Sequence, residues 1–456
     1  MGNLLTSLLN SSNALRVFQQ ALDVTENNVS NASTPGYAKQ SLSIEARPFD
    51  ISSGLPGGVA PGPMISSRDP FAEQDVRQQQ TLLGTAQQKV SDLTPLESTF
   101  DLSGASGVLG AINGLFRSFS ALSINPNDGT SRQAVLDQAN QLSTAFKQSA
   151  NTLAGAGVAA DQQTAATVTQ INQLVAQIAQ INSQSRGSLS GSTDAGKDAA
   201  LNSALEQLSQ FAGVTALQQP DGTVSVYLAG QTPVVIGADV FPIAADFTNP
   251  ASTVIRDHQG NDITKTLAEG QLGATLAVKN TSLPGYESDL NTLAKSVADQ
   301  VNTTLAGGVD INGAAPVVNL FSYNAITGAA GSLAVTAITT NQIAAAAAAA
   351  PGGNGNALAL AGIGTAQTIN GNTFAGFYGS FGGRFGNELA QARDTQTVQE
   401  SRLTQAQNIR KQISGVSLDQ EASNLIDFQR SYQAAAKIFT VLDDLTNTVI
   451  GLIPAV

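Results

Sequence analysis

The longest regular pattern of apolar residues lies at the C-terminal end of the chain. From Leu418 onward, every third or fourth residue is apolar, and neither glycine nor proline interrupts this pattern before Gly451. Such spacing predicts one continuous amphipathic helix over residues 418–452, with an apolar stripe that packs along a partner. The stripe comprises Leu418, Leu425, Phe428, Tyr432, Phe439, Leu442, Leu445 and Val449.

A second apolar stripe lies at the N-terminal end and predicts another long helix over residues 3–31. Its members are Leu4, Leu8, Leu15, Phe18, Leu22 and Val29. Two terminal stripes predict that the two helices pair as a coiled coil, and we expect both stripes to form an assembly interface between chains. An ordinary pair of core helices that closes a bundle would show the same periodicity.

Between the terminal stripes, the apolar pattern mostly has the period of a helix. The predicted helices cover residues 70–99, 107–123, 129–153, 157–185, 198–211, 286–305 and 384–413. Residues 41–63 read as a loop with marginal strands, and residues 307–383 mix strand and loop signals. The alanine run 344–350 gives no firm prediction.

The apolar period falls to two residues between Val214 and Val278, which predicts strands. Asp221 and Gly222 separate two alternating runs and indicate a hairpin. Further strand candidates are residues 234–236, 254–255 and 272–278. We therefore expect a small β domain inserted between helices, with its two ends close together.

These patterns predict a mainly α, elongated protein with nested domains. The terminal coiled-coil domain comprises residues 1–40 and 414–456, and the helical bundle comprises residues 41–212 and 283–413. The inserted, outer β domain comprises residues 213–282.

Composition narrows the functional classes. The chain has 456 residues with a net charge of -12, which argues against binding to nucleic acid or to an anionic membrane surface. It has no cysteine, which excludes disulfides and thiolate chemistry. We find no signal peptide and no apolar run long enough to span a bilayer, so an exported chain would use another route.

Candidate chemistry is sparse. His258 is the only histidine, and its surroundings predict a β-domain loop instead of a catalytic site. Asp443 and Asp444 are adjacent and point apart on a helix, so they do not form an acid and base pair. The glycines between Gly376 and Gly386 lack a phosphate-loop pattern and predict a flexible connector. We predict no catalytic, cofactor-binding or metal-binding residue.

The segment after the first helix is the most distinctive turn in the chain. Helix formers give way to turn residues, and Gly36 after Pro35 fits the positive φ of a type II turn. This turn resembles the signature shared by bacterial flagellar rod, hook and hook-associated proteins. Residues 425–437 resemble the C-terminal signature of the same axial family. The turn residues that carry the resemblance are Asn28, Asn31, Thr34, Pro35, Gly36 and Tyr37.

Within that family, residues 415–421 and 308–313 are similar to the hook-associated protein 1 group. This resemblance implies a structural adaptor, not an enzyme, that joins the flagellar hook to the filament and is extracellular. It implies export in the unfolded state through the flagellar type III apparatus, and assembly into a ring or tube of many copies. The implied partners are other copies, the hook protein, hook-associated protein 3, and a cytoplasmic export chaperone on the C-terminal helix.

Three alternatives remain open at this point. The chain could be another axial component, such as a hook or distal rod protein. An enzyme acting on cell wall or glycan would need paired carboxylates in a cleft of the β insert. A secreted pore-forming or adhesive protein would bind membranes or host surfaces as a monomer.

Overall fold

The computed structural model describes residues 2–50, 55–186 and 194–451, and it is mainly helical as predicted. The chain forms two compact units. Unit 1 contains residues 1–83, 171–242 and 399–456, and unit 2 contains residues 84–170 and 243–398. Both units are discontinuous in sequence, so the nesting of chain segments expected from the sequence is confirmed. The division into three domains stays a prediction.

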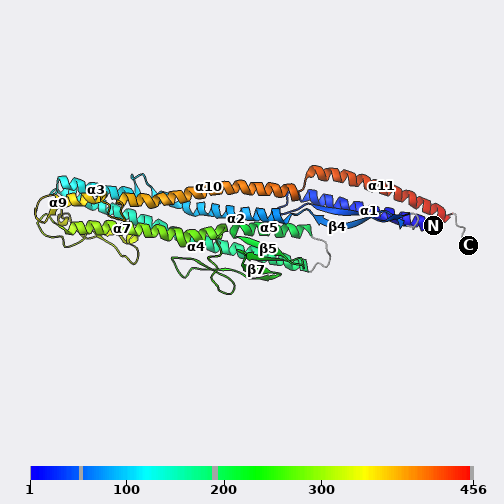
Figure 1. Ribbon diagram of the computed structural model, residues 1–456, viewed down its shortest axis with the longest axis horizontal. Coiled ribbons are helices and arrows are strands. Elements are labelled where there is room, and N and C mark those ends of the chain that lie inside the picture. The colour runs from blue at the N-terminus through cyan, green and yellow to red at the C-terminus, as the bar shows by residue number, and fades with distance from the viewer. Residues whose placement is uncertain (1, 51–54, 187–193, 452–456) are drawn as a thin grey trace. The chain divides into compact units, whose positions relative to one another are not determined.

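The first and last helices of unit 1 lie side by side (Figure 1). They are α1 (Gly2–Ser30) and α11 (Leu418–Gly451). A hydrogen bond joins Asn28, near the end of α1, to Glu421, near the start of α11, so the two helices run antiparallel. The predicted pairing of the terminal helices is confirmed.

A two-stranded ribbon packs beside α1 in the segment that we expected to be mostly loop. Strand β1 (Gln40–Ala46) pairs antiparallel with β4 (Val59–Ser66), and β2 (Phe49–Asp50) pairs with β3 (Leu55–Pro56). A two-stranded ribbon is only marginally stable in water, and the face of α1 supplies the packing that it needs.

The rest of unit 1 combines helical segments with a four-stranded antiparallel sheet. The sheet has the order β5 (Val214–Gln218), β6 (Val224–Leu228), β7 (Thr232–Ile236) and β8 (Asp239–Val240). Its first turn contains Asp221 and Gly222, as predicted, and Gly222 has a φ of 81°. Asn182 anchors the sheet, because its Nδ2 donates to the carbonyl of Val224 at 2.8 Å.

Besides α1 and α11, unit 1 contains α5 (Ala195–Phe211) and parts of three longer helices. These are α2 (Pro70–Leu93), α4 (Gly129–Arg186) and α10 (Phe374–Ser414), and each contributes residues to both units. Val76 and Leu83 of α2 pack against Leu403 and Ala406 of α10 in a small apolar cluster of unit 1.

Unit 2 has the larger hydrophobic core. Helices α3 (Gly107–Ile124) and α7 (Leu283–Ala306) pack there with segments of α4 and α10. The ring of Phe100 lies 4.6 Å from Phe385 and 5.3 Å from Tyr286, measured between centroids. The core of unit 2 thus brings together aromatic residues from three separate chain segments.

Short elements complete unit 2. They are the 3-10 turns Thr94–Phe100, Thr340–Gln342 and Ile363–Thr365, the helices α6 (Gly270–Ala277), α8 (Ala329–Ser332) and α9 (Gly355–Gly362), and the π turn Val278–Ser282. Strand pairs are β9 (Ala244–Asp246) with β10 (Val254–Arg256), β11 (Gly308–Val309) with β14 (Ala346–Ala347), and β12 (Phe321–Ser322) with β13 (Ala334–Val335).

Three local predictions were wrong. Residues 272–278 form part of helix α6 and the start of the π turn instead of a strand, because a short, mostly buried apolar run has the same sequence pattern in both structures. The two helices predicted over 129–185 are one helix, α4. The glycines between Gly376 and Gly386 lie inside α10, which begins ten residues before its predicted start and leaves no flexible connector there.

The buried Lys279 ammonium attaches α4 to the π turn near Gly157. It donates to the carbonyl of Gly157 at 3.2 Å and pairs with Asp161 at 2.8 Å. A Cβ on Gly157 would lie 3.5 Å from this nitrogen, which is an ordinary van der Waals distance. The ion pair therefore does not require glycine at this position, and α4 continues through it.

Helix α3 is the one described segment that is long and apolar enough to cross a membrane. Its 18 residues have a mean hydropathy of 1.2, and we had expected no such segment from the sequence. However, 56% of this segment is buried, and its apolar face packs into the core of unit 2. Packing within the protein thus accounts for its apolar character.

We predict that Asp92→Asn stabilises unit 2. Burial raises the pKa of the Asp92 carboxyl, whose Oδ1 accepts a 2.7 Å hydrogen bond from Gln88. The folded-state pKa therefore lies above the unfolded value of about 3.9, and ionisation destabilises the fold at neutral pH. We expect the variant to melt about 2 to 4 °C higher at pH 7, a shift that corresponds to ~1 kcal/mol.

Asp137→Asn is the matched control, because exposed Asp137 accepts the same kind of bond from Gln133, four residues earlier. Calorimetry between pH 3 and pH 7 checks both variants. The gain for Asp92→Asn should vanish below the ordinary aspartate pKa, where the Asp92 carboxyl is neutral in the folded and the unfolded state. An equal effect of the two substitutions at pH 7 would contradict the assigned role of burial.

Candidate functional site

The turn after α1 is built by short hydrogen-bonded contacts among its own residues. The amide of Tyr37 donates to the carbonyl of Thr34 at 3.1 Å, and the Thr34 hydroxyl donates to Asn31 Oδ1 at 3.1 Å. Gly36 has a φ of +73°, a conformation that costs other residues energy. The turn residues chosen from the sequence therefore form one local structure.

Gly36 also allows the turn to pack closely against α5. A Cβ at this position would lie 2.4 Å from the carbonyl oxygen of Ala199 and 3.0 Å from the amide nitrogen of Ser203. The carbonyl of Gly36 accepts a 2.6 Å hydrogen bond from Nη2 of Arg68. Only glycine satisfies both the backbone conformation and the close approach.

Asn28 is the centre of a buried polar junction between the terminal helices. Its side chain is 1% exposed, and its Nδ2 donates to the carbonyl of Gln40 at 2.8 Å and to Glu421 Oε2 at 3.1 Å. Its Oδ1 accepts from the Gln40 amide and from the Tyr37 hydroxyl, each at 2.9 Å. One side chain thus joins α1, the turn, β1 and α11.

Glu421 completes the junction from the side of α11. It is 1% exposed, and its Oε1 lies 2.9 Å from the ammonium of Lys39. Burial, and then the nearby Glu421 carboxylate, raise the pKa of the Tyr37 hydroxyl. The amide of Lys39 donates to the carbonyl of Ser414 at 2.9 Å, so the end of α10 is attached to the same place.

A cluster of charged side chains surrounds this junction. Arg68 pairs with Glu73 and with Asp198, the latter at 2.7 Å. Arg410 lies 3.1 Å from Glu73 and 2.7 Å from Glu206. These pairs link α2, α5 and α10 to the turn through Arg68, so the terminal helices meet the rest of unit 1 at a charged, largely buried contact.

Ten of the predicted interface residues are half-buried along the contact between α1 and α11. They are Leu4, Leu8, Leu15, Phe18, Leu22, Leu425, Phe428, Phe439, Leu442 and Val449. Four others are exposed, namely Val29, Leu418, Tyr432 and Leu445. The stripe read from the sequence therefore covers two surfaces: a seam within the chain and an outer face.

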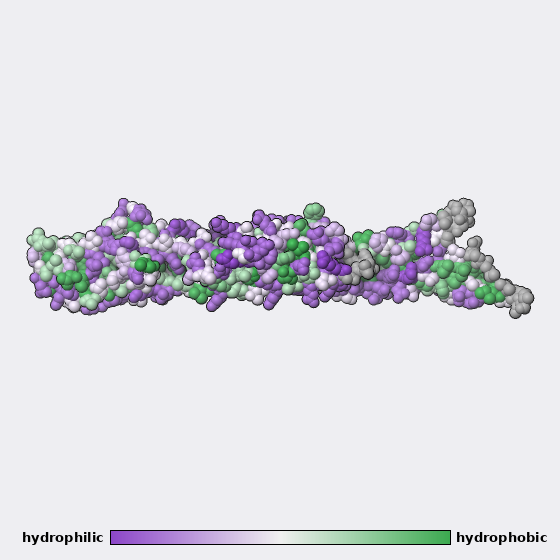
Figure 2. All heavy atoms as spheres, turned by 90° about the horizontal axis from the view of Figure 1, so that it is seen from below, coloured by the Kyte–Doolittle hydropathy of each residue, from purple (hydrophilic) through white to green (hydrophobic). Residues whose placement is uncertain are grey.

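The structure also exposes apolar residues that the sequence reading did not select. Leu5 and Leu9 of α1, and Ile426, Ile438, Val441 and Ile450 of α11, are each 48% to 58% exposed. Figure 2 shows hydrophobic side chains on the surface near both chain ends. Because the helices are antiparallel, Leu5 and Leu9 lie at the same end of the pair as Ile438, Val441 and Leu445. We call these five residues the outer flank.

Polar residues of the junction were also missed. Glu421 lies seven residues before Phe428 and so occupies the same heptad position. A charged residue on an apolar heptad line is the one signal that could have marked it. The partners Lys39, Gln40 and Arg68 show no comparable pattern in the sequence.

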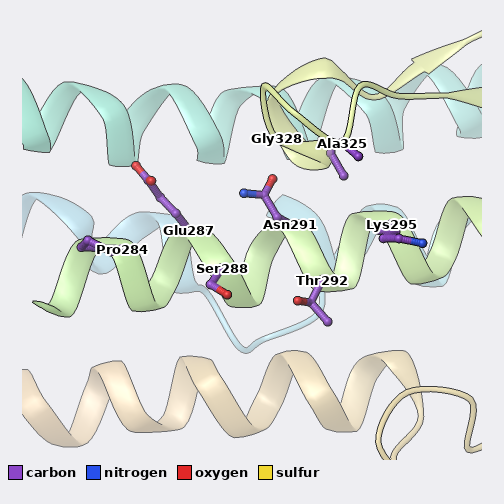
Figure 3. Close-up of a pocket in the computed structure, with 9 residues that line it drawn as sticks. Pro284, Glu287, Ser288, Asn291, Thr292, Lys295, Ala325 and Gly328 are labelled. Atoms are coloured by element: carbon purple, nitrogen blue, oxygen red, sulfur yellow. The ribbon is translucent and has the colours of Figure 1, made fainter. Parts of the chain in front are cut away.

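Other surfaces offer little chemistry. A groove of 420 Å³ lies along α7. The polar side chains that line it include Glu287, Asn291 and Lys295 (Figure 3). Asn291 accepts a hydrogen bond from the Ala330 amide, and Lys295 pairs with Asp299. His258 is exposed in the turn after β10. Among the described residues, no group of three His, Cys, Asp or Glu side chains could hold a metal ion.

Comparison with known families identifies this architecture. The profile of the flagellar hook-associated protein FlgK helical domain matches residues 93–321, half of the chain. The chain belongs to this FlgK family. The profile of flagellar basal body rod proteins matches residues 8–37, and that of the FlgEFG C-terminal region matches residues 412–452. These two matches cover most of α1 with its turn, and all of α11.

Individual FlgK relatives agree with the family assignment. The flagellar hook-associated protein 1 of Bacillus subtilis strain 168 is 26% identical over 96% of this chain and 96% of its own length. The Escherichia coli K12 protein is also 26% identical, over 68% of this chain and 59% of its own length. The FlgK hook junction protein of Burkholderia pseudomallei has the same fold, with a TM-score of 0.67 at 17% identity, covering 75% of this chain and all of that one.

We predict that Gly36→Ala detaches the turn from α5. The matched control is Gly222→Ala, because Gly222 also has positive φ but has no atom within 4 Å of the place that a Cβ would occupy. Backbone strain should cost each variant roughly 1 kcal/mol. The clash at Gly36 should add about 1 to 3 kcal/mol.

Calorimetry measures the stability of both variants, and hydrogen exchange of residues 28–40 reports on the turn. We expect a larger loss of stability and faster exchange only for Gly36→Ala. Equal losses, with exchange of the turn unchanged, would show that the contact with Ala199 has no energetic role.

Proposed function

We propose that this protein is a structural adaptor subunit that joins the flagellar hook to the filament. The observation that carries this proposal is the paired α1 and α11, which bury one apolar seam and leave the outer flank uncovered. Family membership and the full-length match to a hook-associated protein 1 support the same role. The predicted alternative of a hook or distal rod protein is not favoured by these matches.

The outer flank is the surface that we assign to assembly. Ile438, Val441 and Leu445 recur at spacings of three and four residues, so they form one strip on α11. Each such side chain contributes roughly 1.5 to 3 kcal/mol when it becomes fully buried. Repeated contacts of this size, one set per subunit, would hold a ring or tube of copies together.

The remaining exposed members of the predicted interface lie elsewhere on the helix pair. Val29 and Leu418 flank the polar junction at the other end from the outer flank. We infer that they contact neighbours near the base of the helix pair, while the ten seam residues act indirectly by holding α1 and α11 together. The terminal domain of residues 1–40 and 414–456 is thus the proposed assembly domain.

We infer that the partners are other copies of this chain, the flagellar hook protein and hook-associated protein 3. Export through the flagellar type III apparatus would deliver the chain unfolded to the extracellular flagellum. In the cytoplasm, an export chaperone on α11 would cover its apolar residues, which otherwise favour aggregation. We infer no catalytic role and no cofactor, since none of these contacts needs an acid and base pair.

We predict that Val441→Asp blocks assembly without unfolding the chain. Val441 is 58% exposed, so aspartate remains solvated in the free protein. At a subunit contact, the same carboxylate would lose water without gaining a partner, which is strongly unfavourable. Cells that carry only this variant should swim poorly, and labelled protein should be missing from the junction of isolated flagella.

Val158→Asp is the matched control, because Val158 is 57% exposed in the part of α4 that belongs to unit 2. It should label the junction between hook and filament normally. Circular dichroism should show that both variants keep their helices. Normal incorporation of Val441→Asp would remove the outer flank from the proposed interface, and labelling along the whole hook or rod would contradict the adaptor role.

A further inference from the structure

Apolar packing does not select one face in the half of α11 far from the polar junction. In the half far from the polar junction, the buried Ala435 and half-buried Phe439 face α1, while Ile438 and Val441 are exposed. Turning this half by one residue position would exchange these sets, and apolar side chains would still meet α1, whereas in the near half the same turn would replace Leu425 and Phe428 by Asn424 and Asp427. Because hydrophobic burial is not directional, it does not by itself select a face in the far half.

The chain connection does not fix the alignment either. Only Gly415, Val416 and Ser417 separate α10 from α11. Three residues span up to about 10 Å when extended. A shift of α11 by one helical turn, about 5.4 Å, is shorter than the extended length of this link.

The polar junction supplies the direction that apolar packing lacks in the far half. Glu421 accepts from Asn28 at 3.1 Å and pairs with Lys39 at 2.9 Å, and its side chain is 1% exposed. A shift or turn of α11 would separate these atoms and leave Asn28 and the carboxylate without partners. Leaving a buried charge unpaired is among the most unfavourable changes in a protein.

We propose that Glu421 determines which face and which register of α11 pack on α1. In this role Glu421 is a positioning residue: it acts at the start of the helix and keeps Ile438, Val441 and Leu445 directed outward. A single buried polar group sets register in the same way in other coiled coils. The proposal concerns pairing within one chain, so its failure would leave the adaptor function standing.

The replacement Glu421→Leu separates a positioning role from a merely stabilising one. Buried ion pairs that are replaced by apolar residues often keep or gain stability. If Glu421 selects the alignment, Glu421→Leu should keep the helices paired but permit more than one alignment. Glu421→Gln retains an oxygen that accepts from Asn28 and should preserve most of the selection.

Because the chain has no cysteine, single cysteines report the alignment directly. Ala435→Cys probes the seam, where Ala435 is 7% exposed, and Ile438→Cys probes the outer flank, where Ile438 is 55% exposed. In the full chain, we expect a maleimide to react with Cys at 438 at least about tenfold faster than at 435, since only the former is accessible in the aligned pair.

With Glu421→Leu, this ratio should fall to within about threefold, while helix content is retained. With Glu421→Gln, the ratio should stay high. Asp419→Leu is the control, because it removes an exposed acidic residue from the same first turn of α11. It should leave the ratio unchanged.

Two outcomes would overturn the proposal. An unchanged ratio in Glu421→Leu would show that the apolar seam selects the alignment without the carboxylate. A fall in the ratio together with loss of helix would show that Glu421 stabilises the helices without positioning them.

Discussion

The contact between Asn28 and Glu421 is the constraint on which the pairing of the two terminal helices depends. A long helix in water cannot offset the conformational entropy of its own backbone, so α1 and α11 need each other. Their seam buries apolar surface, and the polar junction fixes the position of one helix against the other. From that junction, the turn at Gly36 reaches α5, and the charge cluster of Arg68 and Arg410 reaches α2 and α10.

The two ends of the helix pair have opposite chemistry. At the junction, almost every polar atom has a partner with a defined direction, and a misplaced residue would leave buried charges unpaired. At the far end, Leu5, Leu9, Ile438, Val441 and Leu445 offer exposed apolar area that tolerates adjustment. Hydrogen bonds and ion pairs therefore fix the structure of the single chain, while exposed apolar residues are left to contact neighbours in an assembly.

The sequence was sufficient wherever one periodicity ran without interruption. The heptad stripes predicted α1 and α11, and Asp221 with Gly222 predicted the first turn of the sheet. Prediction failed where tertiary packing overrides local signals. Gly157 lies inside the continuous helix α4, and the run 272–278 belongs to α6 and the π turn, where most of its side chains are buried.

The candidate site shows the same difference between residues that are close in sequence and residues that meet only in the fold. The turn residues are local, and their spacing alone indicated that they form one structure. Glu421 is 393 residues from Asn28, so no local pattern could reveal their contact. For the same reason, periodicity found the apolar residues of α11 but could not separate the seam from the outer flank. To separate the seam from the outer flank, one must know which face of α11 the polar junction holds against α1. The only sign of the junction in the sequence is the Glu421 carboxylate at an apolar heptad position.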